Sequence, residues 1–245
     1  MAKEQRAVVF TLPPFGPWSK RLAIVAGALW LVHLVLWFVA RPGAIELLPT
    51  IRWGGLIPAK VTSDFQVWRV LTYACLDAPT SFDGLWSVIT LWLMGSQIEQ
   101  REGVRGIVIP WLVGALGGAA ALLALSGVAS DYKFGLAMGL SPILFNALIV
   151  KWGFLYARER VSFFGLAEMD GRVLAGVFAL IGVINALTSR TPTAMASLGA
   201  MIVVFGWVGA MQRRGGGGGG TRKRGGSGTF KVIQGGKKDE KKWVN

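Results

Sequence analysis

Ser141 is the residue of this sequence whose type and setting best suit chemistry. It stands in the motif Gly139-Leu140-Ser141-Pro142, at the expected start of an apolar helix. A serine directly before a proline suits a helix N-cap, because its oxygen accepts backbone N–H groups and the proline loses no hydrogen bond in the first turn. The same place suits a nucleophile, because a helix N-terminus stabilises developing negative charge. On residue chemistry alone, the N-cap is the favoured interpretation.

A serine nucleophile requires a base, and the sequence offers no conventional one. A hydroxyl is a weak nucleophile near neutral pH unless a neighbouring group takes its proton. The only histidine is His33, in the first apolar segment, where a lone histidine is typical of a packing residue. Lys151 follows Ser141 by ten residues, about 15 Å along a helix, and is too distant to act on it.

The composition excludes an ordinary soluble protein. Of the 245 residues, 53% are apolar and only 16% are charged, the mean hydropathy is +0.50, and there are eleven tryptophans, which favour membrane interfaces. The net charge of +13 comes mostly from the segment after Arg213, so it does not indicate nucleic-acid binding. The single cysteine, Cys75, excludes a disulfide within the chain, and no cofactor or metal is expected.

The apolar segments predict an all-α polytopic membrane protein with six transmembrane helices. We place these spans at residues 22–40, 84–98, 107–128, 134–156, 173–187 and 193–211. The loop at 41–82 is long, and its pieces 44–58 and 65–76 are apolar enough to lie along the membrane interface without crossing it. The small residues of Gly114-x-x-x-Gly118 allow two helix backbones to approach closely.

We expect three parts: an N-terminal arm (1–20), the membrane domain (21–212) and a basic, Gly-rich tail (213–245). Lysines and arginines are concentrated in the two ends and in the connectors on their side, which predicts that both termini are cytoplasmic. A bacterial inner membrane is the favoured location. The tail, which carries a short apolar motif at 230–233, is a candidate contact for a soluble partner or an anionic lipid.

Several polar side chains fall within or beside the predicted spans. Asn146, Asn185 and Ser197 either form hydrogen bonds between helices or line a hydrated cavity that receives a client helix. Arg69 and Glu99 are expected to bond loop carbonyls and to anchor the long loop at 41–82. The sequence does not indicate whether these two side chains meet.

An ordered set of short motifs carries a resemblance to a known family. Trp68-Arg69 is followed by Leu71-Thr72, then by Gly95-x-x-x-Glu99, by Gly139-x-Ser141 and by Ala196-x-x-Gly199. Over residues 68–206 this order resembles the rhomboid superfamily. The segment 155–165 is also similar to the connector of Derlin-type members, which are relatives without protease activity.

The resemblance implies a six-helix rhomboid-like bundle whose first loop lies sideways in the membrane. Active rhomboids use the serine of Gly-x-Ser and a histidine in the last span, with a histidine and an asparagine of span 2 assisting at the oxyanion. Carried onto this chain, the nucleophile falls on Ser141, the last-span histidine on Ser197, and the oxyanion pair on Asp83 and Ser87. The motif residues Trp68, Arg69, Gly95, Glu99 and Gly139 are present, whereas three of the four catalytic positions differ, and Pro142 replaces a small residue.

Three functions remain open from the sequence. The favoured one is an inactive rhomboid pseudoprotease that binds transmembrane or unfolded membrane-protein clients within the lipid bilayer. The second is an intramembrane serine protease that uses Ser141 with an unconventional base. The third is a small membrane transport or assembly subunit unrelated to rhomboids.

Overall fold

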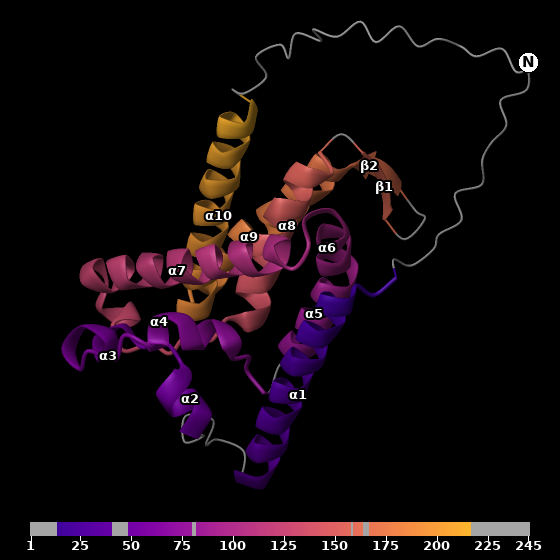
Figure 1. Cartoon of the computed structure of the whole chain (residues 1–245). Helices are drawn as coiled ribbons and strands as arrows, with labels where there is room; N and C mark the ends of the chain where they lie inside the picture. The colour runs from indigo at the N-terminus through magenta and orange to yellow at the C-terminus, as the bar shows by residue number, and fades with distance from the viewer. Residues whose placement is uncertain (1–13, 41–48, 80–81, 158, 164–166, 217–245) are drawn as a thin grey trace, which may run out of the picture.

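The computed structural model describes residues 14–40, 49–79, 82–157, 159–163 and 167–216 (Figure 1). Most of the N-terminal arm, the tail from residue 217 and its apolar motif at 230–233 therefore lie outside the described residues. The long helices are α1 (Pro17–Ala40), α7 (Arg105–Val128), α8 (Leu140–Leu155), α9 (Gly171–Ser189) and α10 (Pro192–Gly216). The shorter elements of the first loop are α2 (Pro49–Gly54), α3 (Pro58–Ser63), α4 (Arg69–Thr72) and the 3-10 turn η2 (Tyr73–Cys75).

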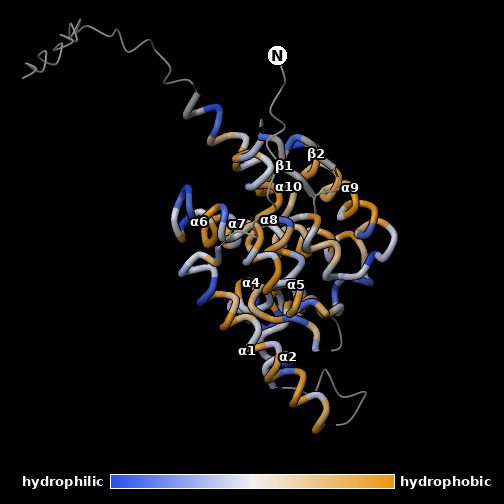
Figure 2. The backbone as a smooth tube through the Cα atoms, turned by 90° about the vertical axis from the view of Figure 1, so that its right-hand side faces the viewer, coloured by the Kyte–Doolittle hydropathy of each residue, from blue (hydrophilic) through white to orange (hydrophobic). Residues whose placement is uncertain are grey.

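The membrane-spanning character expected from the sequence is confirmed in the described residues. Four helices, α1, α7, α9 and α10, are long and apolar enough to cross a membrane, and α8 is a shorter apolar helix. The predicted second span is continuous but irregular: α5 (Asp83–Thr90) and α6 (Ser96–Glu102) are joined by a π-helical turn, η3 (Leu91–Gly95). The count of six spans remains a prediction. Figure 2 shows apolar residues along these helices and hydrophilic ones towards several helix ends.

The predicted fourth span is wrong at its N-terminal end. We expected it to begin near residue 134, whereas α8 begins at Leu140. The preceding residues pair with the first loop instead: the backbones of Leu56 and Ala137 exchange hydrogen bonds of 2.9 and 2.8 Å, and the Ala59 N–H donates to the carbonyl of Lys133 at 2.9 Å. These hydrogen bonds of the loop backbone stabilise the structure more than an N-terminal extension of α8 would.

Arg69 organises the first loop. Its side chain is 3% exposed, and it donates to the backbone carbonyls of Gly55 and Arg52 and to Oε1 of Gln66. The guanidinium fork therefore joins the end of α2 to the start of α4, as an arginine with its five donors can. The loop is fastened to α7 by Tyr73, whose hydroxyl donates to the Ala115 carbonyl at 2.7 Å.

Glu99 has a different role from the one expected, because its partners lie on α1. Its carboxylate accepts the N–H groups of Trp18 at 2.9 Å and Ser19 at 2.8 Å, and the Ser19 hydroxyl at 2.6 Å. An ionised carboxylate only accepts, so it satisfies orphan N–H groups at a helix N-terminus better than loop carbonyls. Glu99 and Arg69 therefore fasten separate elements, and α1 lies alongside α5 and α6 (Figure 1).

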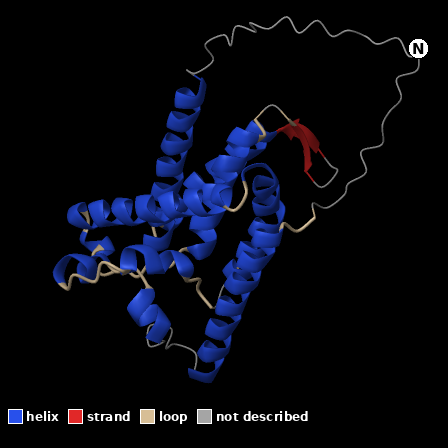
Figure 3. Cartoon of the chain, viewed as in Figure 1, coloured by secondary structure: helices blue, strands red, loops and turns tan. Residues whose placement is uncertain are grey.

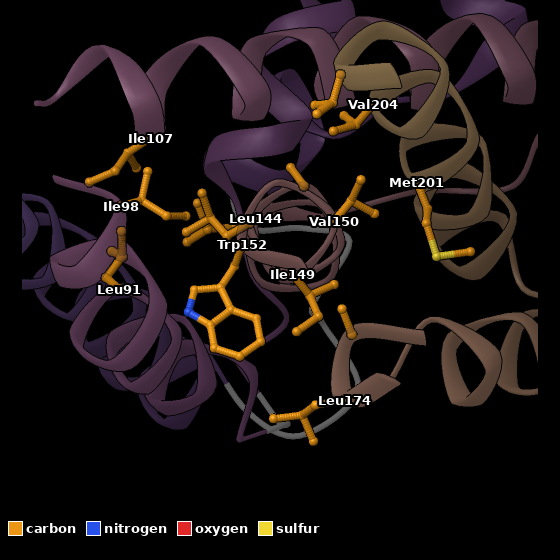
Figure 4. Close-up of a cluster of buried hydrophobic side chains, with 14 of the residues drawn as sticks. Leu91, Ile98, Ile107, Leu144, Ile149, Val150, Trp152, Leu174, Met201 and Val204 are labelled. Atoms are coloured by element: carbon orange, nitrogen blue, oxygen red, sulfur yellow. The ribbon is translucent and has the colours of Figure 1, made fainter. Parts of the chain in front are cut away.

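Helix α8 lies at the centre of the larger apolar core. Its side chains Leu144, Ile149, Val150 and Trp152 are surrounded by residues of η3, α6, α7, α9 and α10, as Figure 4 shows. The helix is buried nearly all round, which matches its uniformly apolar sequence. Outside it, α7 packs most extensively on α10. There, a Cβ on Gly118 would lie 2.5 Å from the Ala196 carbonyl oxygen, so the close helix contact requires glycine.

The connector between α8 and α9 contains a feature that the sequence did not predict. Residues Arg160–Phe163 (β1) and Ala167–Asp170 (β2) form an antiparallel two-stranded hairpin (Figure 3). β-branched and aromatic residues in this short segment, such as Val161 and Phe163, favour strand geometry. Arg101 of α6 closes the same end of the molecule through an ion pair with Glu159.

The role of Arg69 in the loop predicts a stability effect. We expect Arg69→Gln to lower the free energy of unfolding by about 2–4 kcal/mol, because three acceptors lose a buried charged donor. The midpoint of thermal unfolding in detergent measures the change. Arg52→Gln is the matched control, because the Arg52 side chain is exposed and only its carbonyl is used. Equal losses in the two variants would contradict this role.

Candidate functional site

The N-terminus of α8 is closed by the end of the first loop. Three consecutive N–H groups donate to it: Gly139 to the Tyr73 carbonyl at 3.0 Å, Leu140 to the Leu76 carbonyl at 3.1 Å, and Ser141 to Oδ1 of Asp77 at 2.8 Å. The orphan donors of the helix are thereby satisfied from another segment.

Ser141 is not the N-cap that residue chemistry favoured. The cap position belongs to Gly139, and Ser141 is the second residue within the helix. Gly139 has no side chain that could accept a hydrogen bond, so the carboxylate of Asp77 takes the role that a capping side chain usually plays. A Cβ on Gly139 would lie 2.8 Å from Ile143 Cδ1, so any larger residue at this position would require the Ile143 side chain to move.

Asp77 joins α8 to α5. While Oδ1 accepts the Ser141 N–H, Oδ2 accepts the Ser87 hydroxyl at 3.0 Å. The three side chains are almost completely buried, with exposed fractions of 4% for Asp77, 0% for Ser87 and 2% for Ser141. A carboxylate at a helix N-terminus is also favoured by the helix dipole. These residues form the candidate site, and we call them the Asp77 cluster.

Burial makes Asp77 an unusual acid. Removal from water raises the pKa of its carboxyl from the ordinary 3.8 to about 6, and the charge of nearby Asp83 acts in the same direction. The hydrogen bonds from Ser141 and Ser87 oppose the increase, because they favour the ionised form. The group therefore titrates close to neutral pH, as functional carboxyls often do.

The two residues at the oxyanion positions differ in what they contact. Ser87 directs its hydroxyl to Asp77, so that donor is already occupied. Asp83 is the first residue of α5 and is partly buried, and its negative charge contributes to the raised pKa of Asp77. Neither position presents a free neutral donor like the histidine and asparagine implied for active relatives.

Ser197, at the position of the last-span histidine, forms no hydrogen bond with Ser141 within the described part of the chain. Its hydroxyl donates to the Ala194 carbonyl of its own helix at 2.8 Å. The link between α10 and α8 is instead made by Asn146, whose Nδ2 donates to the Ser197 carbonyl at 3.2 Å. Asn146 thus bonds between helices as expected, whereas Asn185 is exposed on α9.

Within the described residues, no imidazole, amine or carboxylate is hydrogen-bonded to the hydroxyl of Ser141. His33 is buried in α1, which packs on α5, and its Nδ1 has no hydrogen-bond partner there. Lys151 pairs with Glu102 at 2.8 Å. The described residues also contain no group of three or more His, Cys, Asp or Glu side chains placed to hold a metal ion.

The other motif residues have contacts that hold the helices and the loop together. Trp68 donates its indole N–H to the Trp53 carbonyl at 3.1 Å, within the first loop. A Cβ on Gly95 would lie 3.3 Å from Ser19 Oγ, so glycine allows α1 to approach η3 closely.

Asp77 is the site residue that the sequence analysis did not single out. A usable signal was present, because an acidic residue inside an apolar membrane domain requires a partner.

The raised pKa of Asp77 predicts a pH-dependent stability. The folded state binds the proton more tightly than the unfolded chain, so this contribution is fully present below pH 4 and is lost as pH rises through about 6. We expect the unfolding midpoint in detergent to fall between pH 5 and pH 7.5, and Asp77→Asn to flatten that fall. Asp131→Asn, at an exposed aspartate, should retain the parental pH dependence. An unchanged pH dependence in Asp77→Asn would exclude this role.

Comparison with known proteins identifies the family. No curated protein matches the chain. A family model described as the rhomboid domain matches residues 64–213, which is more than half of the chain and includes the Asp77 cluster, α7, α8 and α9. The match also covers the ordered motifs from Trp68 to Gly199. This chain therefore belongs to the rhomboid family of membrane proteins.

Proposed function

We propose that this protein is a catalytically silent rhomboid that binds transmembrane or unfolded membrane-protein clients. One observation carries the proposal: the carboxylate of Asp77 is bonded to the backbone N–H of Ser141, at 2.8 Å. Family membership argues against the third hypothesis, a subunit unrelated to rhomboids.

The position of Asp77 opposes acyl transfer at Ser141. A tetrahedral intermediate needs preorganised donors aimed at its oxyanion, and an N–H at a helix N-terminus beside the nucleophile is such a donor. Here that N–H already bonds a carboxylate, and the Ser87 hydroxyl bonds the same group. With a pKa of about 6, Asp77 is mostly ionised at neutral pH. A second negative charge forming beside it would be repelled.

The same aspartate supports the second hypothesis, a protease with an unconventional base. Asp77 is the ionisable side chain that is hydrogen-bonded to Ser141. Its two oxygens bond the N–H of Ser141 and the hydroxyl of Ser87, however, and not Oγ of Ser141. A carboxylate is also a weak base for a serine hydroxyl, which favours the silent protein.

A covalent probe distinguishes the two functions. We expect a fluorophosphonate probe to leave the protein unlabelled in membranes, because among the described residues no base is hydrogen-bonded to the Ser141 hydroxyl and the N–H of Ser141 already bonds Asp77. Gel fluorescence measures labelling, with an active rhomboid protease as the positive control. Labelling that disappears in both Ser141→Ala and Asp77→Asn would establish Asp77 as a base and overturn the proposal.

An aromatic row adjoins the Asp77 cluster and supports a client-binding face. Phe145 of α8 contacts Trp86 of α5, with ring centroids 5.8 Å apart, and Phe178 of α9, with centroids 5.6 Å apart. Trp86 precedes Ser87, and Phe145 lies one turn after Ser141. The row therefore lies between α5 and α9, beside the candidate site. Aromatic side chains can rotate to admit an apolar client helix, and this costs less free energy than separating tightly packed helix backbones.

The proposal predicts position-specific client contacts. With a photoactivatable benzophenone amino acid at Trp86 or at Phe178, we expect adducts with transmembrane proteins. The same amino acid at Ile202, exposed on α10, is the control and should give mainly lipid adducts. Mass spectrometry of the adducts measures the difference. Equal protein yields at the three positions would contradict a client-binding face between α5 and α9.

We also infer a bacterial inner-membrane location with both termini cytoplasmic. The distribution of lysine and arginine along the sequence supports the cytoplasmic position of the termini. The ten basic residues from Arg213 onward would then face the cytoplasm, where they suit a soluble partner or an anionic lipid.

A further inference from the structure

An apolar crevice lies between α1 and the pair α7–α8, away from the aromatic row. Its volume is about 160 Å³. Four of the residues lining it lie on one side of α1 (Leu22, Val25, Ala26 and Leu29), and the opposite wall includes Val108, Trp111, Leu140 and Leu144. On this side of α1, Val25 and Leu29 are exposed, whereas Ala26 is buried and Leu22 is partly buried.

The walls of the crevice suit a hydrocarbon chain. Each residue lining it is apolar except Cys75, a free cysteine. Val25 and Leu29 are 57% and 42% exposed, on a helix that is apolar enough to cross a membrane. From Leu22 to Leu29 the crevice follows α1 for about 10 Å, at 1.5 Å per residue. That length accommodates part of an acyl chain lying along the helix.

Two arginines lie near the N-terminal ends of the helices that line the crevice. Arg21 lies one helical turn before Val25, and Arg105 lies three residues before Val108. Both side chains are exposed, and neither forms an ion pair within the described residues. The Arg21 guanidinium lies 4.8 Å from the ring centre of Trp18, a residue type that favours the membrane interface.

We propose that this crevice binds an anionic phospholipid. One acyl chain lies between α1 and the pair α7–α8, and the phosphate lies between Arg21 and Arg105. The apolar walls alone would accept any lipid, whereas two unpaired arginines at the mouth favour a net negative headgroup. Arginine suits this role because its planar fork bonds phosphate oxygens in pairs.

A second cavity of the protein serves as an internal comparison. It lies between α8, α9 and α10, has a volume of about 660 Å³ and is also lined mainly by apolar residues. Its lining includes one acid, Glu159, and one base, Arg172. Opposite charges at one opening give no preference for an anionic headgroup, so this cavity should accept neutral and anionic lipids alike.

Photo-crosslinking tests the proposal. The full chain is reconstituted in vesicles that contain a small fraction of either phosphatidylglycerol or phosphatidylcholine with the same diazirine on the acyl chain. We expect phosphatidylglycerol adducts to concentrate on crevice residues such as Trp111, at several times the phosphatidylcholine yield. Each arginine near a membrane surface contributes about fivefold in lipid preference, so Arg21→Gln and Arg105→Gln should each lower the ratio by about that factor. Arg172→Gln, at the comparison cavity, should leave the ratio unchanged.

A second readout does not use the arginine variants. Cys75 is the only cysteine and lines the crevice, so a bound chain should slow its reaction with a membrane-permeant maleimide. Val25→Trp, which adds a large side chain at the exposed edge of the crevice, should abolish both the adducts and the dependence of Cys75 labelling on phosphatidylglycerol. Equal adduct yields for the two lipids, or adducts spread evenly over the apolar surface, would show annular contact only and overturn the proposal.

Discussion

The buried carboxylate of Asp77 is the interaction on which the candidate site depends. It closes the N-terminus of the central helix α8 and, through Ser87, connects that helix to α5. A charge with 4% exposure inside a membrane domain is tolerated because each of its oxygens accepts a hydrogen bond. The contact that stabilises the helix also occupies a donor that acyl transfer would need. A single contact therefore stabilises the helix and bears on the chemistry open to Ser141.

Three other polar side chains each hold a different part of the bundle together. Arg69 gathers the carbonyls of the first loop, Glu99 closes the start of α1, and Tyr73 joins the loop to α7. Each satisfies backbone groups that helices and strands leave without a partner. Because these anchors lie around the site and not in it, a rhomboid can keep its architecture while the groups next to Ser141 change. Family membership therefore establishes the fold, and the contacts at Ser141 decide the chemistry.

Two sides of the membrane domain differ in the side chains that they expose. Between α5 and α9, aromatic side chains meet over α8, beside the Asp77 cluster. Between α1 and α7, an apolar crevice ends near unpaired arginines. The first suits an apolar helix, and the second suits a lipid with a charged headgroup.

The sequence by itself determined the membrane class, the approximate positions of the long helices and the family. Apolar runs of membrane length and short motifs in fixed order are local properties, so they can be read without coordinates. Only the tertiary structure decided the start of α8, the partners of Glu99 and the role of Asp77. Each of these depends on contacts between residues far apart in the chain: Leu56 with Ala137, Glu99 with Ser19, and Asp77 with Ser141. Local propensity does not encode such pairings, because a buried polar group takes whichever partner the packing of the helices brings to it.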